Sequence, residues 1–434
     1  MAKIVQDVMK KKDGYILDTT YPIYFYKEMQ PFWLKTVFGI LGFKTSAIEQ
    51  SFSYLELGCA QGINLIIAAM QNPHAQFIGV DFNAEHIAHA KALVQHLRLN
   101  NIKFIESDFA TFLETNQLSY DFIVNHGTFS WVSHLQQEKI LEIAAKFLKE
   151  KGIFYLHYMC YPGSTELQPI QKLLNLVDQS TGQSSLKGLQ EGKKLFSQLY
   201  DAGAFIHQSK IQSIVNTLNQ KNEYLAHEFL TNHWQPFYSV DVHQRVFDSS
   251  QMSYIGSANP SHNIDSISLP SKLQNIIAEI QEPALKEYLK DLARNSKQRV
   301  DVFQKKPINL QSKEHLDTLK SLEFTSGRAF VPNQKIVFQT AVGDIQAPEQ
   351  IIASLLQRLS QKNMIAADFM QLEPFENNIL FLIETLCLLM EAGYIHPVMH
   401  KGSDVDPDLV EKFNLYMKNA ELGLQLSSTG IVLV

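Results

Sequence analysis

Ser53-Tyr54-Leu55-Glu56-Leu57-Gly58-Cys59-Ala60-Gln61-Gly62 is the stretch that decides the fold. Its first five residues predict a buried strand, because a short apolar run that ends at a turn residue is typical of strands. Gly58 permits a tight turn, and the small residues Ala60 and Gly62 let a ligand approach the backbone. A helix is expected at 64–70. This strand, turn and helix are typical of a ligand-binding turn, although an ordinary turn would have the same pattern.

Strands and helices alternate beyond this turn. Further strands are predicted at 76–80, 102–105, 120–124 and 152–158, and helices at 84–97 and 136–149. Such alternation implies right-handed crossovers and a parallel sheet, in which the carboxyl ends of the strands share one edge. The sequence therefore predicts an α/β, Rossmann-like sheet that binds its ligand along that edge.

The rest of the chain predicts further regions. Residues 166–222 lack strand patterns and predict a helical insertion, and strands at 223–229 and 252–256 could finish the sheet as an antiparallel pair. We expect the first domain to span 1–262, a helical middle region 263–345, and a winged-helix-like domain 346–434. This last region holds five basic and eleven acidic residues, so it is unsuited to neutralising DNA phosphates.

Composition excludes several classes of protein. There are 38 Lys and Arg against 44 Asp and Glu in 434 residues, a net charge of −6, which gives no basic face for nucleic acid. Three cysteines cannot form a disulfide framework, which favours a reducing compartment and a cytoplasmic protein. We expect no secretory signal, no membrane span, and a solvated N-terminus around the lysines at 10–12.

Acidic residues stand at the ends of the next two predicted strands. Asp81, followed by Phe82, ends the second strand, and Asp108, followed by Phe109, ends the third. Asp81 can accept hydrogen bonds from both hydroxyls of a ribose. Asp108 can accept one from an adenine amino group, with Phe109 against the ring. Each aspartate alone could equally be the N-cap of a helix.

Polar residues also follow the fourth predicted strand. Asn125, His126 and Gly127 begin an irregular segment that reaches Trp131. Such a segment at the carboxyl edge of a sheet is placed for binding or catalysis. His126 could be a base or an ordinary hydrogen-bonded loop histidine.

Together, these four strand ends resemble those of the class I S-adenosylmethionine-dependent methyltransferases, over about residues 50–160. Ala60 departs from the pattern, because many members have a second glycine there. A nicotinamide-dependent dehydrogenase is the rival interpretation. The spacing of Gly58 and Gly62, the Asp108-Phe109 pair and the antiparallel final strand favour methyl transfer. The resemblance implies S-adenosylmethionine (SAM) as cofactor and S-adenosylhomocysteine (SAH) as product.

The resemblance also implies a role for each strand end. The methionine portion would lie on the glycine turn, the ribose on Asp81 and the adenine on Asp108, while Asn125 and His126 would border the methyl group. The expected cofactor-binding residues are Glu56, Gly58, Cys59, Ala60, Gly62, Asn64, Asp81, Phe82, Asp108, Phe109, Asn125 and His126.

A narrower resemblance covers most of residues 15–305. Tyr21-Pro22 and the segments 126–132, 158–163, 224–228, 234–238 and 299–303 look like those of bacterial methyltransferases with a methyltransferase regulatory domain. That group includes protein lysine methyltransferases of outer-membrane proteins, and methylation of lysine in a protein is the leading hypothesis, although the family resemblance does not determine the substrate. A small metabolite or natural product as acceptor, and a cofactor-binding module without turnover, stay open. The expected assembly includes a homodimer as one option.

Lysine as acceptor would need a desolvating pocket. The ammonium group has an ordinary pKa near ~10.4, and burial between aromatic rings lowers it while the rings hold the cation. Tyr24, Trp131 and Tyr158 are candidates for such walls, beside Asn125 and His126, although each aromatic could be ordinary core.

No metal site is predicted. The histidines at 86, 89 and 96 share one predicted helix, but no carboxylate or cysteine completes a ligand set at a suitable spacing. His227, Glu228 and His233 fit an interface between the sheet and the insertion.

Overall fold

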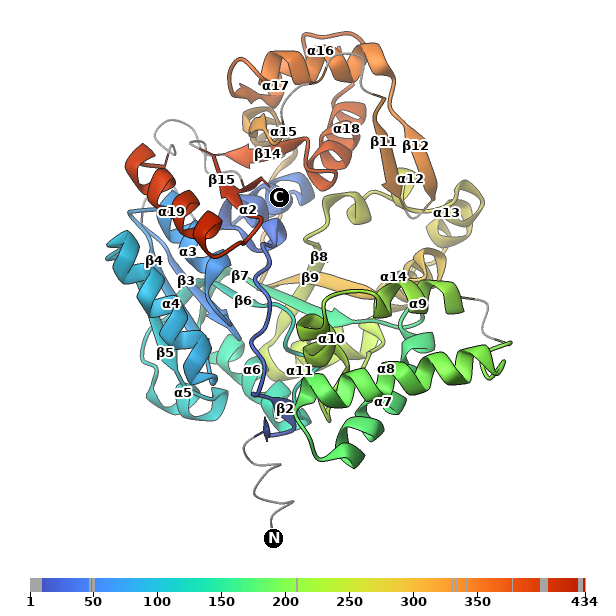
Figure 1. Ribbon diagram of the computed structural model, residues 1–434. Helices are drawn as coiled ribbons and strands as arrows, with labels where there is room; N and C mark the ends of the chain where they lie inside the picture. The colour runs from blue at the N-terminus through green and yellow to red at the C-terminus, as the bar shows by residue number, and fades with distance from the viewer. Residues whose placement is uncertain are drawn as a thin grey trace.

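A seven-stranded sheet forms the centre of the computed structural model (Figure 1), in the order β5-β4-β3-β6-β7-β9-β8. The structure describes residues 10–46, 48, 51–207, 210–328, 331, 335–340, 342–376, 378–398, 405–427 and 432–433. The parallel strands are β3 (Ser53–Leu57), β4 (Gln76–Asp81), β5 (Ile102–Glu106), β6 (Tyr120–Asn125) and β7 (Leu148–Met159). The predicted α/β, Rossmann-like sheet is confirmed.

Helices cover both faces of this sheet (Figure 1). One face carries α2 (Pro31–Leu41), α3 (Ile63–Gln71) and α4 (Ala84–Leu97), and the other carries α5 (Phe109–Thr115), α6 (His134–Phe147) and α11 (Ser239–Ser250). Successive strand residues point to opposite faces, so Tyr54 packs in the first core while Leu55 and Leu57 pack in the second. This double burial explains why the strands are continuous apolar runs.

The antiparallel end of the sheet differs from the prediction in its second strand. β8 (Met252–Ser257) is present as expected, but its partner is β9 (Gln298–Lys305), which also pairs with β7. β9 falls in a segment that we expected to be helical. Its buried positions include Arg299 and Asp301, which form an ion pair with Nε–Oδ1 at 2.9 Å. These charges hide the strand pattern, and the expected boundary at residue 262 is wrong.

Residues 223–229, predicted as a strand, belong to helix α10 (Asn222–Phe229). Leu225, Ala226 and Phe229 fall at helical spacing and pack in one core with the insertion. The insertion consists of α7 (Gln168–Thr181), α8 (Ser185–Asp201) and α9 (Ile211–Leu218). The predicted helical insertion is therefore confirmed, and α10 joins it to the sheet.

Of the three N-terminal lysines expected to be solvated, Lys12 is exposed, but Lys10 and Lys11 are not. Lys10 pairs with the buried carboxylate of Asp178 in α7, and Lys11 Nζ lies 3.1 Å from the same carboxylate. The chain enters through a short hairpin of β1 (Lys11–Lys12) and β2 (Tyr15–Ile16), then passes η1 (Lys27–Met29) before α2. The insertion therefore anchors the segment that leads to the sheet.

The C-terminal half contains a small second sheet. β10 (Glu323–Ser326) pairs with β13 (Met364–Ile365) and with β14 (Ile395–Val398). Packed around it are α15 (Ser312–Ser321), α16 (Glu349–Leu359), α17 (Ala366–Phe369) and α18 (Ile379–Glu391). Because β10 lies before residue 346, the expected boundary there is wrong, while the winged-helix-like character of this region stays a prediction.

The last helix returns to the first domain. Phe413 and Met417 of α19 (Pro407–Asn419) share a core with Leu97 of α4, and Figure 1 shows α19 beside α4. The remaining elements are η2 (Thr165–Leu167), η3 (Pro260–Asn263), α12 (Asp265–Ser268), α13 (Ser271–Ala278), α14 (Pro283–Arg294), β11 (Val337–Thr340), β12 (Gly343–Gln346), β15 (Gln425–Leu426) and β16 (Val432–Leu433).

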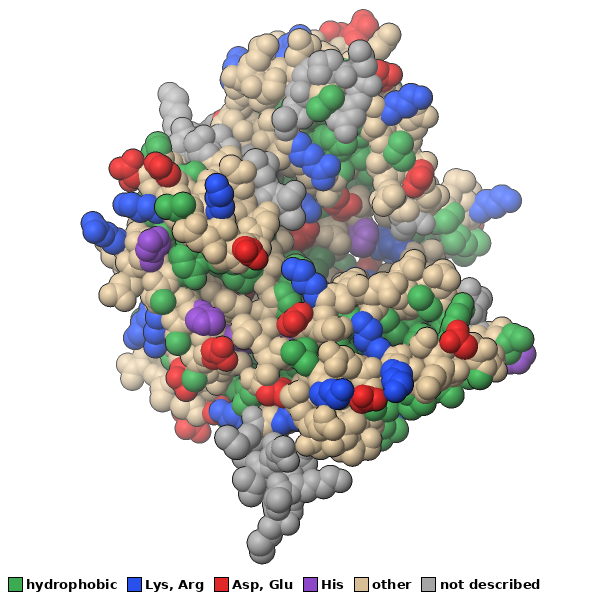
Figure 2. All heavy atoms as spheres, in the orientation of Figure 1, with side chains coloured by type: hydrophobic (Ala, Val, Ile, Leu, Met, Phe, Trp, Pro, Cys, Tyr) green, Lys and Arg blue, Asp and Glu red, His purple; other side chains and the backbone are tan. Residues whose placement is uncertain are grey.

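Charges of both signs are interspersed over the face seen in Figure 2. Among the described residues, no helix has the length and apolar content that a membrane span requires.

Candidate active site

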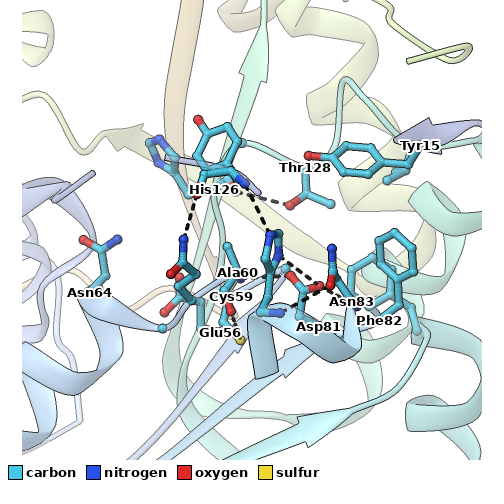
Figure 3. A pocket seen from close by; sticks show the side chains of 18 of the residues that line it. Tyr15, Glu56, Cys59, Ala60, Asn64, Asp81, Phe82, Asn83, His126 and Thr128 are labelled. Atoms are coloured by element: carbon cyan, nitrogen blue, oxygen red, sulfur yellow. Dashed lines mark hydrogen bonds and ion pairs between the residues drawn. The ribbon is translucent and has the colours of Figure 1, made fainter. Parts of the chain in front are cut away.

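A cavity of about 380 Å³ lies at the carboxyl ends of β3, β4, β5 and β6 (Figure 3). The chain order along the sheet reverses between β3 and β6, and open α/β sheets bind ligands at such a point. Of the residues selected from sequence, those that line the cavity are Tyr24, Glu56, Gly58, Cys59, Ala60, Gly62, Asn64, Asp81, Phe82, Asp108, Phe109 and His126. Separate strand ends thus converge on one site.

The glycine turn forms the floor of this cavity. Gly58 and Gly62 have φ of +76° and +72°, in the left-handed region that favours glycine. A Cβ atom on Gly58 would lie 2.3 Å from Oγ1 of Thr128, and one on Gly62 would lie 2.2 Å from the ring of Phe104. Glycine is therefore required at both positions for backbone conformation and for space.

Asp81 is fixed by backbone donors from two segments. Its Oδ2 accepts from the N–H of Ala60 and its Oδ1 from the N–H of Asn83, both at 2.9 Å. Burial raises the pKa of Asp81, while His86 and these backbone donors lower it. Each oxygen keeps a second lone pair, so the fixed carboxylate can also accept from hydroxyl groups of a ligand.

Glu56 is a buried carboxyl group with an unused oxygen. Its Oε2 has no hydrogen-bond partner among the residues that the structure describes, and burial together with the Asp81 charge raises the pKa of Glu56 to about 8. A buried acceptor without a partner is costly, and the cavity beside it could admit a cationic donor. The amino group of SAM fits this requirement, so the chain's own residues match the cofactor.

Asp108 caps a helix and also lines the cavity. Its Oδ1 accepts from the N–H of Thr111 at 2.8 Å and caps α5, and this donor lowers the pKa of Asp108. Asp108 and the neighbouring ring of Phe109 also line the cavity. An N-cap and a ligand contact are compatible because a carboxylate can accept several hydrogen bonds.

A tyrosine-rich segment near the N-terminus lines one side of the cavity. Asn64 Oδ1 accepts from the N–H of Tyr26 at 2.8 Å, and its Nδ2 donates to the carbonyl of Tyr24 at 3.3 Å. Gln61 Nε2 donates to the carbonyl of Tyr21 at 2.8 Å. The turn and α3 therefore hold this segment over the site. Sequence reasoning missed Tyr21 and Tyr26, although the density of aromatic residues there was a signal.

His126 lies in a row of stacked rings. Its ring centroid is 3.8 Å from that of Tyr26 and 4.2 Å from that of His157, which in turn lies 5.9 Å from Trp131. His126 Nδ1 is 2.7 Å from the hydroxyl oxygen of Tyr155. Burial, and then His157, holds the pKa of His126 well below its usual value. His126 is thus uncharged at neutral pH.

Three residues selected from sequence do not line the cavity. Trp131 lies behind His157, and Asn125 donates from Nδ2 to the carbonyl of Leu57 at 2.8 Å, which joins β6 to β3. Tyr158 points to the other core and its hydroxyl bonds Asp301 Oδ2 at 2.5 Å. Because side chains alternate along β7, His157 occupies the side expected for Tyr158.

No three His, Cys, Asp or Glu side chains are grouped as metal ligands in the part of the chain that the structure describes. His86 instead lies 3.9 Å from Asp81, measured from Nδ1 to Oδ1. His227 contacts Thr19 and Tyr15.

Comparisons with known protein families agree with this site. Residues 48–236 match a family model described as a methyltransferase domain, and residues 221–305 match one described as a predicted methyltransferase regulatory domain. The second match runs to the end of β9, so it includes the strand that the sequence analysis missed.

Two relatives of similar sequence have names that state no activity. An uncharacterized protein of Synechocystis, sll1526, is 26% identical over 438 residues, covering 98% of this chain and 86% of that protein. An uncharacterized protein of Rickettsia prowazekii, RP789, is 33% identical over 157 residues, covering 36% and 28% of the two chains.

A solved structure shares the fold over nearly the whole chain. PKMT2 from Rickettsia typhi, in complex with AdoHcy, has a TM-score of 0.71 at 19% identity, and the match covers 95% of this chain and 85% of that one. A second structure of PKMT2 from Rickettsia typhi gives a TM-score of 0.68.

Proposed function

Since the chain is an S-adenosylmethionine-dependent methyltransferase, we propose that it methylates lysine side chains of a protein substrate by in-line transfer. In this reaction the amine nitrogen attacks the methyl carbon, the carbon–sulfur bond breaks, and its electron pair stays on sulfur to give SAH. SAM supplies the electrophilic methyl group. The chain's own residues bind, orient and desolvate.

We assign the cofactor contacts by the strand ends that line the cavity. The turn at Gly58 and the unpaired oxygen of Glu56 would hold the methionine portion, and Asp81 would accept from the ribose hydroxyls. Asp108 and Phe109 would face the adenine. His126 is uncharged, so its ring can lie beside a sulfonium without electrostatic repulsion.

The observation that carries the choice of lysine is the group of tyrosine rings at the cavity. The ring centroid of Tyr24 lies 6.0 Å from that of Tyr21, 6.3 Å from that of Tyr26 and 5.7 Å from that of Tyr224. Aromatic faces attract an ammonium ion, and desolvation favours the neutral amine that can attack. We therefore assign the aromatic walls around the acceptor amine to Tyr21, Tyr26 and Tyr224, in place of Trp131 and Tyr158.

Positioning is the main contribution required of the protein. In-line transfer needs the nitrogen within roughly 3–3.5 Å of the methyl carbon and water excluded from the path. Asn64 and Gln61 hold the tyrosine segment against the glycine turn, so the same contacts would order both cofactor and acceptor. The resemblance in sequence to the group that includes bacterial protein lysine methyltransferases supports a protein acceptor.

The test uses SAM with a tritiated methyl group and a bacterial outer-membrane protein fraction. We expect label in protein bands, recovered after hydrolysis as methylated lysine, and no label when the lysines have first been acetylated. The matched control enzyme is Asp81→Ala. Label found only in the small-molecule fraction would support a metabolite as acceptor, and cofactor binding without any SAH formation would support a binding module.

A homodimer also stays a prediction. Light scattering of the purified protein at several concentrations measures the molar mass and decides between one and two chains.

A further inference from the structure

A second cavity, of about 230 Å³, lies between the insertion and the end of the sheet. Figure 1 labels α9 and α10, two helices that contribute to its lining. Its walls come from the end of β7, from α9 and α10, and from the start of β9. Lys210 and Lys297 line it and are exposed, whereas Glu228 lines it and is only 9% exposed. Glu166, which is half-buried, also lines the cavity, so its more exposed part carries both signs of charge and its buried part carries the Glu228 carboxylate.

The inner end of this cavity reaches the cofactor cavity. Tyr224 lines the second cavity, and its ring centroid lies 5.7 Å from that of Tyr24 and 6.4 Å from that of Tyr21, which both line the first. Burial, Tyr26 and then the Glu228 carboxylate raise the pKa of the Tyr21 hydroxyl. The two cavities therefore adjoin at these tyrosine rings, and Glu228 lies in the lining of the second.

Glu228 lacks a cationic partner. Among the described residues, no Lys, Arg or His forms an ion pair with its side chain. Burial raises the pKa of Glu228 to about 7, and the Trp234 and Tyr224 groups that face it limit the rise. A buried carboxylate is normally paired, so this one is suited to a cation supplied by a ligand.

We propose that the second cavity admits the acceptor side chain and that Glu228 binds the ammonium group of the substrate lysine, with Tyr224 beside its aliphatic part. This inference rests on the proposed function, since it assumes lysine as acceptor. A four-carbon chain with a terminal charge matches a cavity of about 230 Å³ that is lined by a buried carboxylate. Neutral acceptors would leave that carboxylate without a cationic partner, because Trp234 and Tyr224 supply only neutral groups.

The first test changes the charge and keeps the shape. Glu228→Gln should raise the KM for the outer-membrane protein fraction at least tenfold and leave the Kd for SAH within twofold of wild type. Glu228→Asp, which retains the charge, should recover part of the loss. In wild type, n-butylammonium should inhibit competitively against the protein, and n-butanol should not. Glu228→Gln should lose this selectivity.

The second test blocks the passage. Thr217 on α9 lines the cavity, so Thr217→Trp should lower kcat/KM for the protein at least tenfold without changing SAH affinity. Gln212→Trp is the matched control, because Gln212 is an exposed residue on the same helix outside the cavity lining, and its kcat/KM should stay within twofold.

Failure of this inference differs from failure of the proposed function. If wild type methylates lysine but Glu228→Gln keeps its KM, Glu228 does not bind the ammonium group. If Thr217→Trp keeps its kcat/KM, the acceptor arrives by another route. If wild type methylates no lysine, the proposed function falls, and failure of n-butylammonium to bind the SAH complex would separately overturn the cation site.

Discussion

The carboxylate of Asp81, at the end of β4, accepts a hydrogen bond from the backbone N–H of Ala60, in the turn after β3, at 2.9 Å. Ala60 has φ of +45°, a conformation that costs roughly 1–2 kcal/mol for an L-residue outside glycine. The hydrogen bond stabilises the turn in that conformation. Two neighbouring strand ends are therefore coupled, and an alanine is tolerated where a second glycine is common in the family.

We predict that Asp81→Asn weakens cofactor binding about 10- to 100-fold, because hydrogen bonds to a charged group contribute roughly 1.5–3 kcal/mol. In this variant the amide nitrogen, itself a donor, would face the N–H of either Ala60 or Asn83, so one of these two hydrogen bonds would be lost. Calorimetric titration with SAH measures the change in Kd. The matched control is Glu106→Gln, an exposed residue of β5 paired in register with Asp81, which should bind SAH as wild type does. An unchanged Kd in Asp81→Asn would remove Asp81 from the site.

Glu56 gives a prediction for stability against pH. Its folded pKa is about 8 and its unfolded pKa is about 4.3, so between these values the folded state holds a proton that the unfolded state releases. Stability from this group is therefore lost as pH rises from about 4.5 to about 8. Glu56→Gln removes that loss. We expect the Tm of apo Glu56→Gln to exceed that of wild type by more at pH 8.5 than at pH 5.5, in thermal unfolding monitored by circular dichroism.

The same variant should bind SAM more weakly, because the amide cannot supply a negative charge to the amino group.

The stability prediction for Glu56→Gln has its own control. Comparing Tm differences between variant and wild type cancels the effect of other titrating groups. A Tm difference that stays constant across this pH range would show that Glu56 is not protonated in the folded apo protein.

Two glycines of the site separate backbone strain from steric clash. Gly62 has φ of +72° and its missing Cβ would lie 2.2 Å from Phe104, whereas Gly127 has φ of +64° and nothing within 4 Å. Gly62→Ala should lower the free energy of unfolding by about 2–6 kcal/mol, from strain plus overpacking. Gly127→Ala should cost only about 1–2 kcal/mol. Urea unfolding measures both, and equal losses would contradict the assigned clash.

The strand ends that line the first cavity could be predicted because their signals are local. A strand pattern followed by Gly58, Asp81, Asp108 or His126 is visible within a few residues, and a parallel sheet then brings the four positions to one edge. The helical insertion was visible for the same reason, through its own periodicity.

The parts that could not be predicted depend on distant partners. Arg299 and Asp301 look like surface residues in sequence, and only pairing within the sheet makes them compatible with a buried strand. Tyr26 joins the site because Asn64, far along the chain, accepts its N–H. Tyr158 was chosen over His157 because the register of β7 cannot be read to one residue from the sequence, and one residue reverses the face.

We predict that Asp301 contributes to the stability of the fold and does not affect cofactor affinity. Its carboxylate accepts from Tyr158 Oη at 2.5 Å, from Arg299 Nε at 2.9 Å and from His243 Nε2 at 2.8 Å. Burial alone would raise the pKa of Asp301. Arg299 and His243 together lower it by more than burial raises it, so the pKa lies below its usual value. Its contribution to stability is present at neutral pH and is lost as pH falls through the lowered value.

Asp301→Asn leaves Arg299 with one fewer anion in a buried position, although Asp291 still lies 2.7 Å from its Nη1. We expect a loss of about 3–5 kcal/mol in the free energy of unfolding, measured at pH 7 by urea titration, and no change in the Kd for SAH, because this network faces away from the cofactor cavity. Tyr158→Phe is the matched control, since it removes one hydrogen bond and keeps the ion pair, and should cost only about 1–3 kcal/mol. A change in SAH affinity without a loss of stability would instead connect this network to the cofactor site and return Tyr158 to it.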